Sequence, residues 1–484
     1  MGYIDRDLKE IHELLVNGEI TPLDLVNEAF ERIEEEKDLN CFITLNKEEA
    51  IKRAKELEGK VEKDNLLWGI PIAVKDNIVT KDLRTTCASH ILDNFIPIYD
   101  ATVVEKINNK KMIIIGKTNM DEFAMGSTSR TSYFGAPRNP WNKDKITGGS
   151  SGGSASCVSS RIVKFALGSD TGGSIRQPAS YCGIVGMKPT YGRISRYGLI
   201  AFASSLDQIG PMTTNVFDNA VLLNELVGRD ERDLTSSFKE KEDFTRFIGK
   251  DVKGLKIAIP TYFMSDITSS VIKNKILEVK KLLEENGAVV DFVDMKYLEN
   301  AVNLYQIIAM GEASSNLARF DGIRYGYSYE NPENIDDLYL ETRKNGFGNE
   351  VKRRIMVGSY LLSGDNAKTY YNKALSIRDD MKKEFDRVFS EYDLIIGPTT
   401  TTTAYNLDQD LDDPLKSFMD DVLVIPVNMA GLPGLNIPVG FSDEDNMPIG
   451  MHIIGNSFEE AKMYGFASFV ENKLKLSLNP KGDE

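Results

Sequence analysis

Apolar residues along the chain fall into two recurring patterns, short continuous runs and longer stretches with helical spacing. Short apolar runs bounded by turn residues are typical of buried strands. They predict strands at residues 70–74, 112–115, 162–167, 255–259, 288–293, 394–396, 435–439 and 449–454. Stretches with helical spacing separate several of these runs. This alternation predicts an α/β domain with a large, mostly buried sheet.

Three helices stand out in the same pattern. The first begins at Thr21 and Pro22, where a hydroxyl cap precedes a proline at the first helical position. Apolar residues then follow at helical spacing, namely Leu25, Val26, Ala29, Phe30 and Ile33. A second helix is expected at residues 47–58. The third, at residues 271–286, is amphipathic and is stopped by Gly287.

We expect a single domain over residues 1–484, made of four regions. Residues 1–65 are a helical N-terminal region, and residues 66–230 are a core rich in serine and glycine. Residues 231–420 are more helical, and residues 421–484 return to the core. The charged segments 229–251 and 330–354 predict surface connections or a more helical subdomain. The threonine run at 399–403 predicts a strand end and loop.

Composition limits the class of protein and the cellular compartment that we expect. The 484 residues are 41% hydrophobic and 27% charged, as in an ordinary soluble globular protein. No apolar run approaches the ~20 residues that span a bilayer. Four cysteines without C-x-x-C spacing, and only three histidines, argue against disulfides or a zinc site. Because the N-terminus has no signal-peptide pattern, we expect a cytoplasmic protein.

The net charge of −15 bears on possible partners. A protein that holds nucleic acid by itself normally carries a basic stripe. If RNA takes part in the function, we therefore expect another chain to hold most of its phosphates.

Serine and glycine crowd two short stretches, residues 148–154 (GGSSGGS) and 168–174 (GSDTGGS). Each lies where an apolar run meets a turn. One interpretation is a flexible linker. Another is a phosphate-binding turn, although the spacing fits neither G-x-G-x-x-G nor G-x-x-x-x-G-K-[ST]. A third is a serine nucleophile on an exposed turn, with backbone N–H groups placed to hold an oxyanion.

An activated serine needs a base, and no histidine lies near either stretch in the sequence. A Ser-His-Asp triad would require the fold to bring up His12, His90 or His452. Lys75 directly follows an apolar run. A lysine at the end of a buried strand either extends to solvent or loses its proton. Lys75 is therefore either a candidate base or an ordinary surface strand end.

Together these motifs resemble the amidase signature family. The resemblance rests on the two Ser/Gly stretches, on residues 175–178 (IRQP) after the second stretch, and on Lys75, 75 residues before Ser150. It extends to residues 116–123, 186–193 and 204–211, so that it covers nearly the whole chain. The resemblance implies the fold of the family, a large mixed β-sheet core covered by helices on both faces.

The resemblance also implies a Ser-Ser-Lys triad. Ser174 would be the nucleophile, Ser150 a bridging serine preceded by a cis peptide bond, and Lys75 the base. Lys75 must be neutral to accept a proton. Lowering a lysine pKa from ~10.4 to about 7–8 needs roughly 3–5 kcal/mol of bias against the charged form, which burial must supply. The oxyanion hole would consist of backbone N–H groups around Thr171, Gly172, Gly173 and Ser174.

By the same resemblance the substrate is glutamine, whose α-ammonium and α-carboxylate need one acid and one arginine in the pocket. Asp421 and Arg354 match the family positions for these two tasks. An arginine can hold a carboxylate through two parallel hydrogen bonds. Tyr305 matches a pocket tyrosine. Without the resemblance, each of the three would be taken for an ordinary surface charge or core aromatic.

Two loops depart from the family pattern. Residues 127–131 have the sequence STSRT where SSTEN is expected, and the 399–403 run replaces a segment with more proline. We expect the first loop to lie near the pocket and assign no role to Arg130.

The resemblance implies a glutaminase component of an ATP-dependent complex that converts mischarged Glu-tRNA(Gln) to Gln-tRNA(Gln). This chain would hold no metal and no cofactor. ATP and Mg²⁺ would act at a partner, the B subunit, which would receive the ammonia and hold most of the tRNA. A small C subunit would stabilise the assembly. A stand-alone amidase for another small amide and a non-catalytic scaffold with the same fold are the alternatives.

Overall fold

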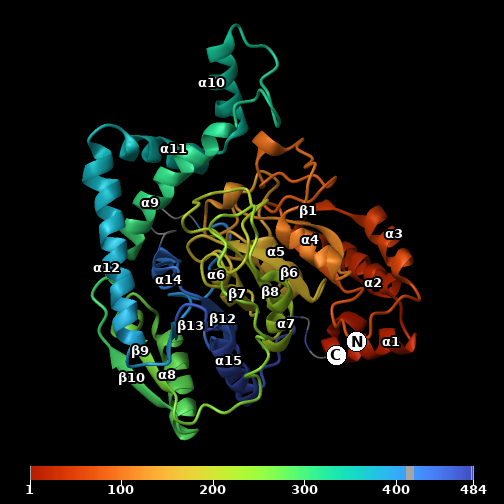
Figure 1. Ribbon diagram of the computed structural model, residues 1–484, viewed down its shortest axis with the longest axis vertical. Coiled ribbons are helices and arrows are strands. Elements are labelled where there is room, and N and C mark those ends of the chain that lie inside the picture. Colours follow the sequence, from red (N-terminus) through yellow and green to blue (C-terminus); the bar gives the residue numbers. More distant parts are fainter. Residues whose placement is uncertain (1, 410–418, 481, 483–484) are drawn as a thin grey trace.

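The computed structural model describes residues 2–409, 419–480 and 482. Its centre is an eleven-stranded mixed sheet with the strand order β1-β3-β2-β6-β8-β7-β12-β13-β11-β9-β10 (Figure 1). These strands are β1 (Phe42–Leu45), β2 (Pro71–Lys75), β3 (Ile113–Thr118), β6 (Phe165–Asp170), β7 (Val185–Lys188), β8 (Gln208–Thr213), β9 (Lys256–Pro260), β10 (Val289–Val293), β11 (Leu394–Pro398), β12 (Gly434–Phe441) and β13 (Pro448–Ile454). A separate pair joins β4 (Arg138–Asn139) to β5 (Asn142–Ile146). All four regions expected from the sequence contribute strands to the large sheet.

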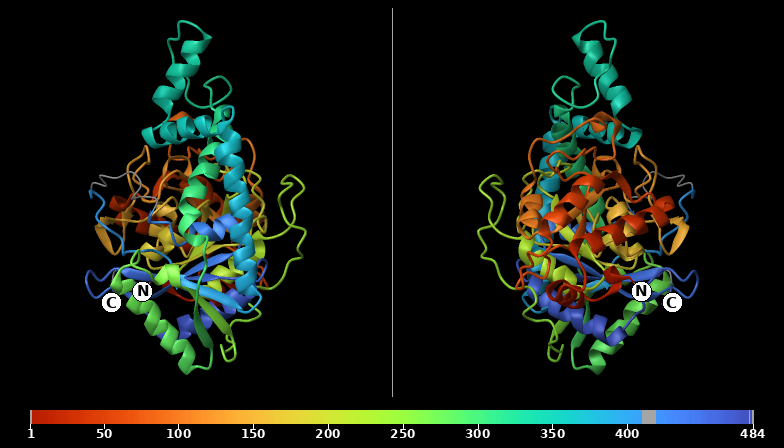
Figure 2. Two further views of the ribbon diagram at one scale, coloured as in Figure 1. Left: turned by 90° about the vertical axis from the view of Figure 1, so that its left-hand side faces the viewer. Right: turned by 90° about the vertical axis from the view of Figure 1, so that its right-hand side faces the viewer.

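Helices surround the sheet. They are α1 (Leu8–Asn17), α2 (Pro22–Glu35), α3 (Lys47–Leu57), α4 (Thr102–Asn109), α5 (Gly152–Ser159), α6 (Arg176–Tyr181), α7 (Val216–Leu226), α8 (Ser270–Glu285), α9 (Ala301–Asn316), α10 (Ile335–Gly346), α11 (Asn349–Leu362), α12 (Asn372–Phe389), α14 (Ile425–Ala430) and α15 (Glu460–Leu474). Helix α10 extends away from the sheet at one end of the long axis (Figures 1 and 2).

Strand β13 shows that helices cover both faces of the sheet. A Cβ atom on Gly450 would lie 2.5 Å from Ser180 Oγ of α6. Its neighbours Ile449 and Met451 point to the opposite face, because successive strand residues alternate between the two faces. They belong to a hydrophobic cluster that includes Phe466 of α15. The expected α/β fold, with a large mixed sheet between helices, is confirmed.

All eight strands expected from the apolar runs are present. The run at 162–167 becomes a strand only at residue 165, because residues 160–164 first turn the chain back from α5. The sheet also contains three strands that were not expected, β1, β7 and β8. Strands β7 and β8 contain glycine, and β8 also contains Pro211, which is unusual inside a sheet and hides the strand pattern.

The expected helices form at the expected places. The Thr21 side chain accepts a hydrogen bond from Asp24 N–H, and Thr21 N–H donates to Asp24 Oδ2 (2.7 Å), which completes a capping box at the start of α2. Helices α3 and α8 lie within one residue of the expected bounds 47–58 and 271–286.

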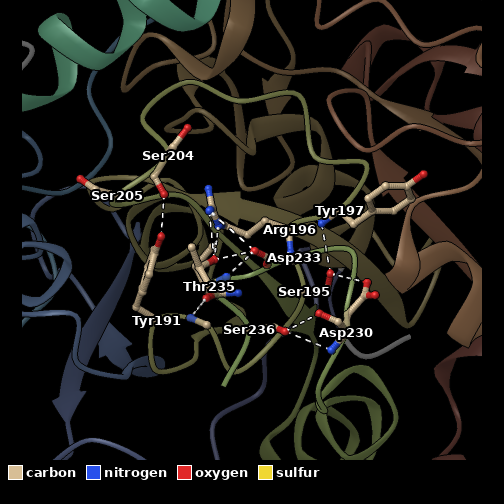
Figure 3. A network of polar contacts seen from close by, with 12 residues as sticks. Tyr191, Ser195, Arg196, Tyr197, Ser204, Ser205, Asp230, Asp233, Thr235 and Ser236 are labelled. Carbon is tan, nitrogen blue, oxygen red and sulfur yellow. Dashed lines mark hydrogen bonds and ion pairs between the residues drawn. The ribbon is translucent and has the colours of Figure 1, made fainter. Parts of the chain in front are cut away.

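The charged and threonine-rich segments have different structures. Segment 229–251 connects α7 to β9, and its first part is anchored: Ser195 Oγ donates to Asp230 (2.7 Å) and Arg196 N–H donates to Asp233 (2.8 Å) (Figure 3). Segment 330–354 contains α10 and the start of α11, and is thus the helical alternative. The 399–403 run directly follows β11, as expected of a strand end and loop.

Parallel pairing fixes where the chemistry of this chain is concentrated. Strand β2 pairs in parallel with both β3 and β6, so the carboxyl ends of the three strands meet at one edge of the sheet. The last residues of these strands, Lys75, Thr118 and Asp170, are all buried. In α/β folds, ligands bind outside this edge. Residues 119–124 and 171–175 follow the strands here.

Candidate active site

The last side chain of β2 lies at the centre of the site. Lys75 is fully buried, and its Nζ donates hydrogen bonds to Ser150 Oγ (2.7 Å), Ser151 Oγ (2.8 Å) and the Ser169 carbonyl oxygen (3.2 Å). Burial lowers the pKa of Lys75 to about 7, because desolvation disfavours the charged amine. Three carboxylates act in the opposite direction, those of Asp121, Asp170 and Asp207. Near neutral pH, much of Lys75 is therefore neutral and able to accept a proton.

The two Ser/Gly stretches pack against each other through their backbones. Ser151 N–H donates to the Ser174 carbonyl oxygen (3.1 Å), and the peptide bond between Gly149 and Ser150 is cis. Lys75 and Ser150 have no exposed surface, whereas Ser174 keeps 5%. Among the described residues, the Ser150 hydroxyl is bonded to Lys75 and not to the Ser174 hydroxyl. Ser174 is thus the outermost of the three side chains.

Asp170 organises the turn that carries Ser174. Its carboxylate accepts hydrogen bonds from Gly173 N–H (2.8 Å) and Ile175 N–H (3.1 Å), and it pairs with Arg176 through Nε and Nη2 (3.0 Å each). Burial alone would raise the pKa of Asp170, but the Arg176 guanidinium outweighs burial and holds this pKa well below its usual range. The turn is therefore fixed around a buried ion pair.

This arrangement determines which backbone donors of the turn are available. Gly173 N–H, one of the expected oxyanion donors, is already bonded to Asp170. In the described part of the chain, the N–H groups of Thr171, Gly172 and Ser174 donate to no protein acceptor. Unpaired N–H groups in a buried turn are rare and point to a ligand or a reacting atom as their partner.

Tyr305 of α9 and Asp421 lie directly against this turn. A Cβ atom on Gly172 would lie 2.8 Å from the Tyr305 ring, and one on Gly173 would lie 2.6 Å from Asp421 Oδ1. Asp421 Oδ1 is buried and has no hydrogen-bond partner among the described residues. Burial raises the pKa of Asp421 well above its usual range. A buried acceptor of this kind is one that a cationic group of a ligand would satisfy.

Arg354 of α11 lies in the same region. Its side chain is buried, its Nε donates to Glu350 Oε1 (2.7 Å), and its Cζ lies 5.5 Å from the centre of the Phe202 ring. Burial raises the pKa of the Tyr305 hydroxyl, and the positive charge of Arg354 partly opposes this shift. The structure thus gathers Tyr305, Arg354 and Asp421 near the turn that holds Ser174.

The 127–131 loop packs against the first Ser/Gly stretch, as expected. Ser129 Oγ donates to the Gly148 carbonyl oxygen (2.9 Å), and Gln177 Nε2 donates to the Ser127 carbonyl oxygen (2.8 Å). Arg130 Nη1 donates to the carbonyl oxygens of residues 407 and 409. The arginine that departs from the family pattern therefore holds a neighbouring loop.

Three residues of the site were not predicted from the sequence: Asp121, Ser151 and Asp170. Asp121 N–H donates to the Ser150 carbonyl oxygen (3.2 Å), and Asp121 Oδ2 would lie 2.1 Å from a Cβ on Gly149. Ser151 and Asp170 lie inside the two Ser/Gly stretches, so their positions were visible in the sequence. Ser151 contacts Lys75 of β2, which no local pattern reveals, whereas the Gly173, Ile175 and Arg176 partners of Asp170 lie within six residues of it.

The three histidines have other partners. His12 Nε2 is hydrogen-bonded to the Lys63 carbonyl oxygen (2.8 Å), and His90 packs on two tyrosine rings. His452 contacts the ion pair of the Ser174 turn, with its Nε2 3.0 Å from Arg176 Nη1, and burial lowers its pKa well below the usual range. No histidine among the described residues is hydrogen-bonded to Ser174.

The described residues contain no cluster of three or more side chains suited to hold a metal ion. In the same part of the chain, every helix is too short or too polar to cross a membrane. The four cysteines are buried thiols without disulfide bonds.

Known proteins share most of this sequence. The family model described as Amidase matches residues 24–463. The chain is 53% identical over 466 residues, 96% of each chain, to the A subunit of glutamyl-tRNA(Gln) amidotransferase of Pediococcus pentosaceus. It is 52% identical over 475 residues, 98% of each chain, to the protein of the same name from Listeria monocytogenes. The chain therefore belongs to the amidase family.

Solved structures share the fold. The A subunit of glutamyl-tRNA(Gln) amidotransferase from Thermotoga maritima superimposes with a TM-score of 0.83 at 40% identity, covering 99% of this chain and 97% of that chain. The peptide amidase from Stenotrophomonas maltophilia gives a TM-score of 0.82 at 26% identity, covering 100% and 99%. A peptide amidase thus has the same architecture as an amidotransferase subunit.

Proposed function

We propose that this chain is the glutaminase subunit of a tRNA-dependent amidotransferase. It hydrolyses glutamine and supplies ammonia to a cytoplasmic, ATP-dependent complex that converts Glu-tRNA(Gln) to Gln-tRNA(Gln). The observation that carries the proposal is the 2.7 Å hydrogen bond between Lys75 Nζ and Ser150 Oγ, beside the turn that holds Ser174. Relatives that are more than 50% identical over nearly the whole chain carry the name of this activity.

The first half of the reaction forms an acyl-enzyme. Ser174 Oγ attacks the side-chain amide carbon of glutamine, its proton passes to Ser150, and Ser150 gives its own proton to neutral Lys75. The negative charge that develops on the amide oxygen accepts hydrogen bonds from the unpaired N–H groups of Thr171 and Gly172. Catalytic hydrogen bonds often close only when substrate is bound, which is consistent with the separate Ser150 and Ser174 hydroxyls.

The second half of the reaction releases both products. The amide C–N bond breaks as the nitrogen takes a proton back from Lys75 through Ser150, and ammonia leaves a glutamyl ester on Ser174. Water then attacks the ester carbon while Ser150 and Lys75 take its proton. The C–O bond to Ser174 breaks, the hydroxyl regains a proton, and glutamate departs. A base with a pKa near the working pH suits both directions of transfer.

Charge placement supports glutamine as the substrate. The buried Oδ1 of Asp421 is an unpaired acceptor, among the described residues, for the α-ammonium group. Arg354 provides the positive charge that the α-carboxylate needs, and Tyr305 closes one side of the pocket above Gly172. A substrate with both α-groups would thus be oriented with its side-chain amide toward Ser174.

The proposal assigns the remaining chemistry to partners. Ammonia passes to the B subunit, where ATP and Mg²⁺ activate the glutamyl group of Glu-tRNA(Gln), and a small C subunit stabilises the assembly. The net charge of −15 supports this division, because an acidic chain is poorly suited to hold tRNA phosphates by itself.

A stand-alone amidase is the second candidate, favoured by the structural similarity to a peptide amidase. Glutamine hydrolysis by this chain, purified with the B and C subunits, separates the two candidates. The amidotransferase predicts hydrolysis that rises when Glu-tRNA(Gln) and ATP are both added. Brisk hydrolysis of unrelated amides by the lone chain, without any response to the tRNA, would support the stand-alone amidase.

A further inference from the structure

Three consecutive residues after β3 connect the two halves of the site. Asp121 N–H donates to the Ser150 carbonyl oxygen (3.2 Å), on the side of the Ser/Gly turns. The Phe123 ring packs on Phe347, with ring centres 5.6 Å apart, just before α11 begins. Glu122 lies between these two contacts and is 2% exposed.

Glu122 binds the first turn of α11 from a distant part of the chain. Gly348 N–H donates to both carboxylate oxygens of Glu122, at 3.1 and 2.9 Å, across 226 residues of sequence. Ser89 Oγ donates to Oε1 of the same carboxylate and also to the Gly346 carbonyl oxygen (3.3 Å). The Glu122 backbone is held as well, because its N–H donates to Thr131 Oγ1 (3.0 Å).

This contact pairs a backbone group at the start of α11. The first N–H groups of a helix have no partner within the helix, and the helix dipole places partial positive charge there. One of these groups is the N–H of the capping residue Gly348, and the Glu122 carboxylate accepts its hydrogen bonds. A Cβ on Gly348 would lie 2.3 Å from Glu122 Oε2. Glycine at this position thus lets the Glu122 carboxylate reach the helix end.

Helix α11 carries Arg354, the arginine proposed to hold the glutamine α-carboxylate. Arg354 lies six residues after Gly348, which is about 9 Å along the helix axis. Its Nε is bonded to Glu350 of the same helix (2.7 Å). Arg354 therefore moves with α11, and the position of α11 relative to the Ser150 turn depends on how its first turn is held.

We propose that Glu122 is a positioning residue for substrate binding: by holding the first turn of α11, its carboxylate sets the place of Arg354 relative to Ser150 and Ser174. This inference rests on the proposed function. Glu122 does not touch the reacting atoms, so its removal weakens glutamine binding while the acyl-transfer steps proceed.

The test is Glu122→Gln in the complex with the B and C subunits, assayed for glutamine hydrolysis. Glutamine keeps the size of the side chain but removes its charge and one acceptor. We expect KM for glutamine to rise about three- to tenfold, with kcat within about twofold of the wild-type value. Burial raises the pKa of Glu122 to about 7, so the assays are run at pH 8, where the carboxylate is ionised.

Glu471→Gln is the matched control. Glu471 of α15 also accepts a hydrogen bond at the start of a helix, here from Val216 N–H, the first residue of α7 (3.0 Å), and burial likewise raises its pKa to about 7. Glu471 is thus a buried carboxylate like Glu122, but the helix that it contacts carries none of the pocket residues. We expect Glu471→Gln to lower the melting temperature and leave KM for glutamine unchanged.

A double-mutant cycle with Arg354→Lys shows whether Glu122 acts through Arg354. If it does, Glu122→Gln changes KM much less in the Arg354→Lys background than in the wild type.

If Glu122→Gln fails to fold, Ser89→Ala takes its place. This variant removes one hydrogen-bond donor from the same carboxylate, and we expect a smaller rise in KM for glutamine.

An unchanged KM in a folded Glu122→Gln complex would overturn the inference, as would equal KM effects with and without Arg354. A fall in kcat at constant KM would also overturn it, because this result would assign Glu122 to the chemistry. A wild-type complex that hydrolyses no glutamine would contradict the proposed function itself, before any variant is compared.

Discussion

Lys75 Nζ lies 2.7 Å from Ser150 Oγ at the carboxyl end of β2, in a place from which water is excluded. A hydrogen bond in that setting holds the amine against a hydroxyl that has no other partner among the described residues. Burial and the parallel arrangement of β2, β3 and β6 produce this contact together, because they bring a lysine and two serine turns to one edge of the sheet.

The pH dependence of glutamine hydrolysis follows from this contact. Lys75 acts as a base only when neutral, and burial lowers its pKa to about 7. Below that pH the protonated fraction grows, so kcat/KM falls about tenfold for each pH unit on the acid side and levels off above pH 8 or so. A stopped assay of glutamate formation from pH 5 to 9 measures the profile.

The profile has a clear control in Lys75→Arg, which keeps the positive charge but stays protonated throughout this range. This variant should be nearly inactive at every pH. Substantial activity in Lys75→Arg, or an acid limb unrelated to a group near pH 7, would show that another residue is the base.

Asp421→Asn tests how glutamine is recognised. The amide keeps the shape of the side chain but cannot ionise beside a bound α-ammonium group, so we expect KM for glutamine to rise about 10- to 100-fold. Asp420→Asn is the neighbouring control, since Asp420 already accepts a hydrogen bond from Tyr405 (2.8 Å). Steady-state kinetics on both variants decide the matter, and similar KM values for the two would count against Asp421 as the ammonium-binding acid.

Asp170→Asn tests the ion pair under the nucleophile turn. The change leaves the buried Arg176 without its counter-charge, and removing one member of a buried pair costs about 3–5 kcal/mol of unfolding free energy. The pKa of Asp170 is depressed in the folded state, so its contribution is present above the unfolded pKa of ~3.9 and is lost as the pH falls through the folded value. Urea unfolding at pH 7 measures the loss.

Asp38→Asn provides the comparison for this stability test. Asp38 is exposed and pairs with Lys143 at the surface (3.1 Å), so its change should leave the unfolding midpoint where it is. Equal midpoints for the Asp170 and Asp38 variants would mean that the buried pair does not stabilise the turn.

Sequence patterns predicted eight strands of the sheet, among them β3 with its run of three isoleucines, and missed three strands, β1, β7 and β8. Strand β8 is buried in the middle of the sheet, yet its sequence QIGPMT lacks a strand pattern. It is held by pairing with β6 and β7, which is a tertiary effect.

The site residues likewise differ in how far they could be predicted from the sequence. Lys75, Ser150 and Ser174 were found because they lie in motifs that resemble a family. The hydrogen bond from Gly173 N–H to Asp170 spans three residues and was not expected, whereas the one from Asn428 to Asp170 spans 258 residues and depends on the fold. Glu122 lies in the 116–123 motif, but its role gave no signal, since its partner Gly348 lies 226 residues further along the chain.

Ser174→Ala in the complex with the B and C subunits shows whether this chain supplies nitrogen through Ser174. Gln-tRNA(Gln) formation is measured with glutamine and, separately, with ammonium chloride as the nitrogen source. We expect no product with glutamine and wild-type levels with ammonium chloride. Product formed from glutamine by the variant, or loss of both reactions in a folded complex, would show that Ser174 does not supply the nitrogen in this way.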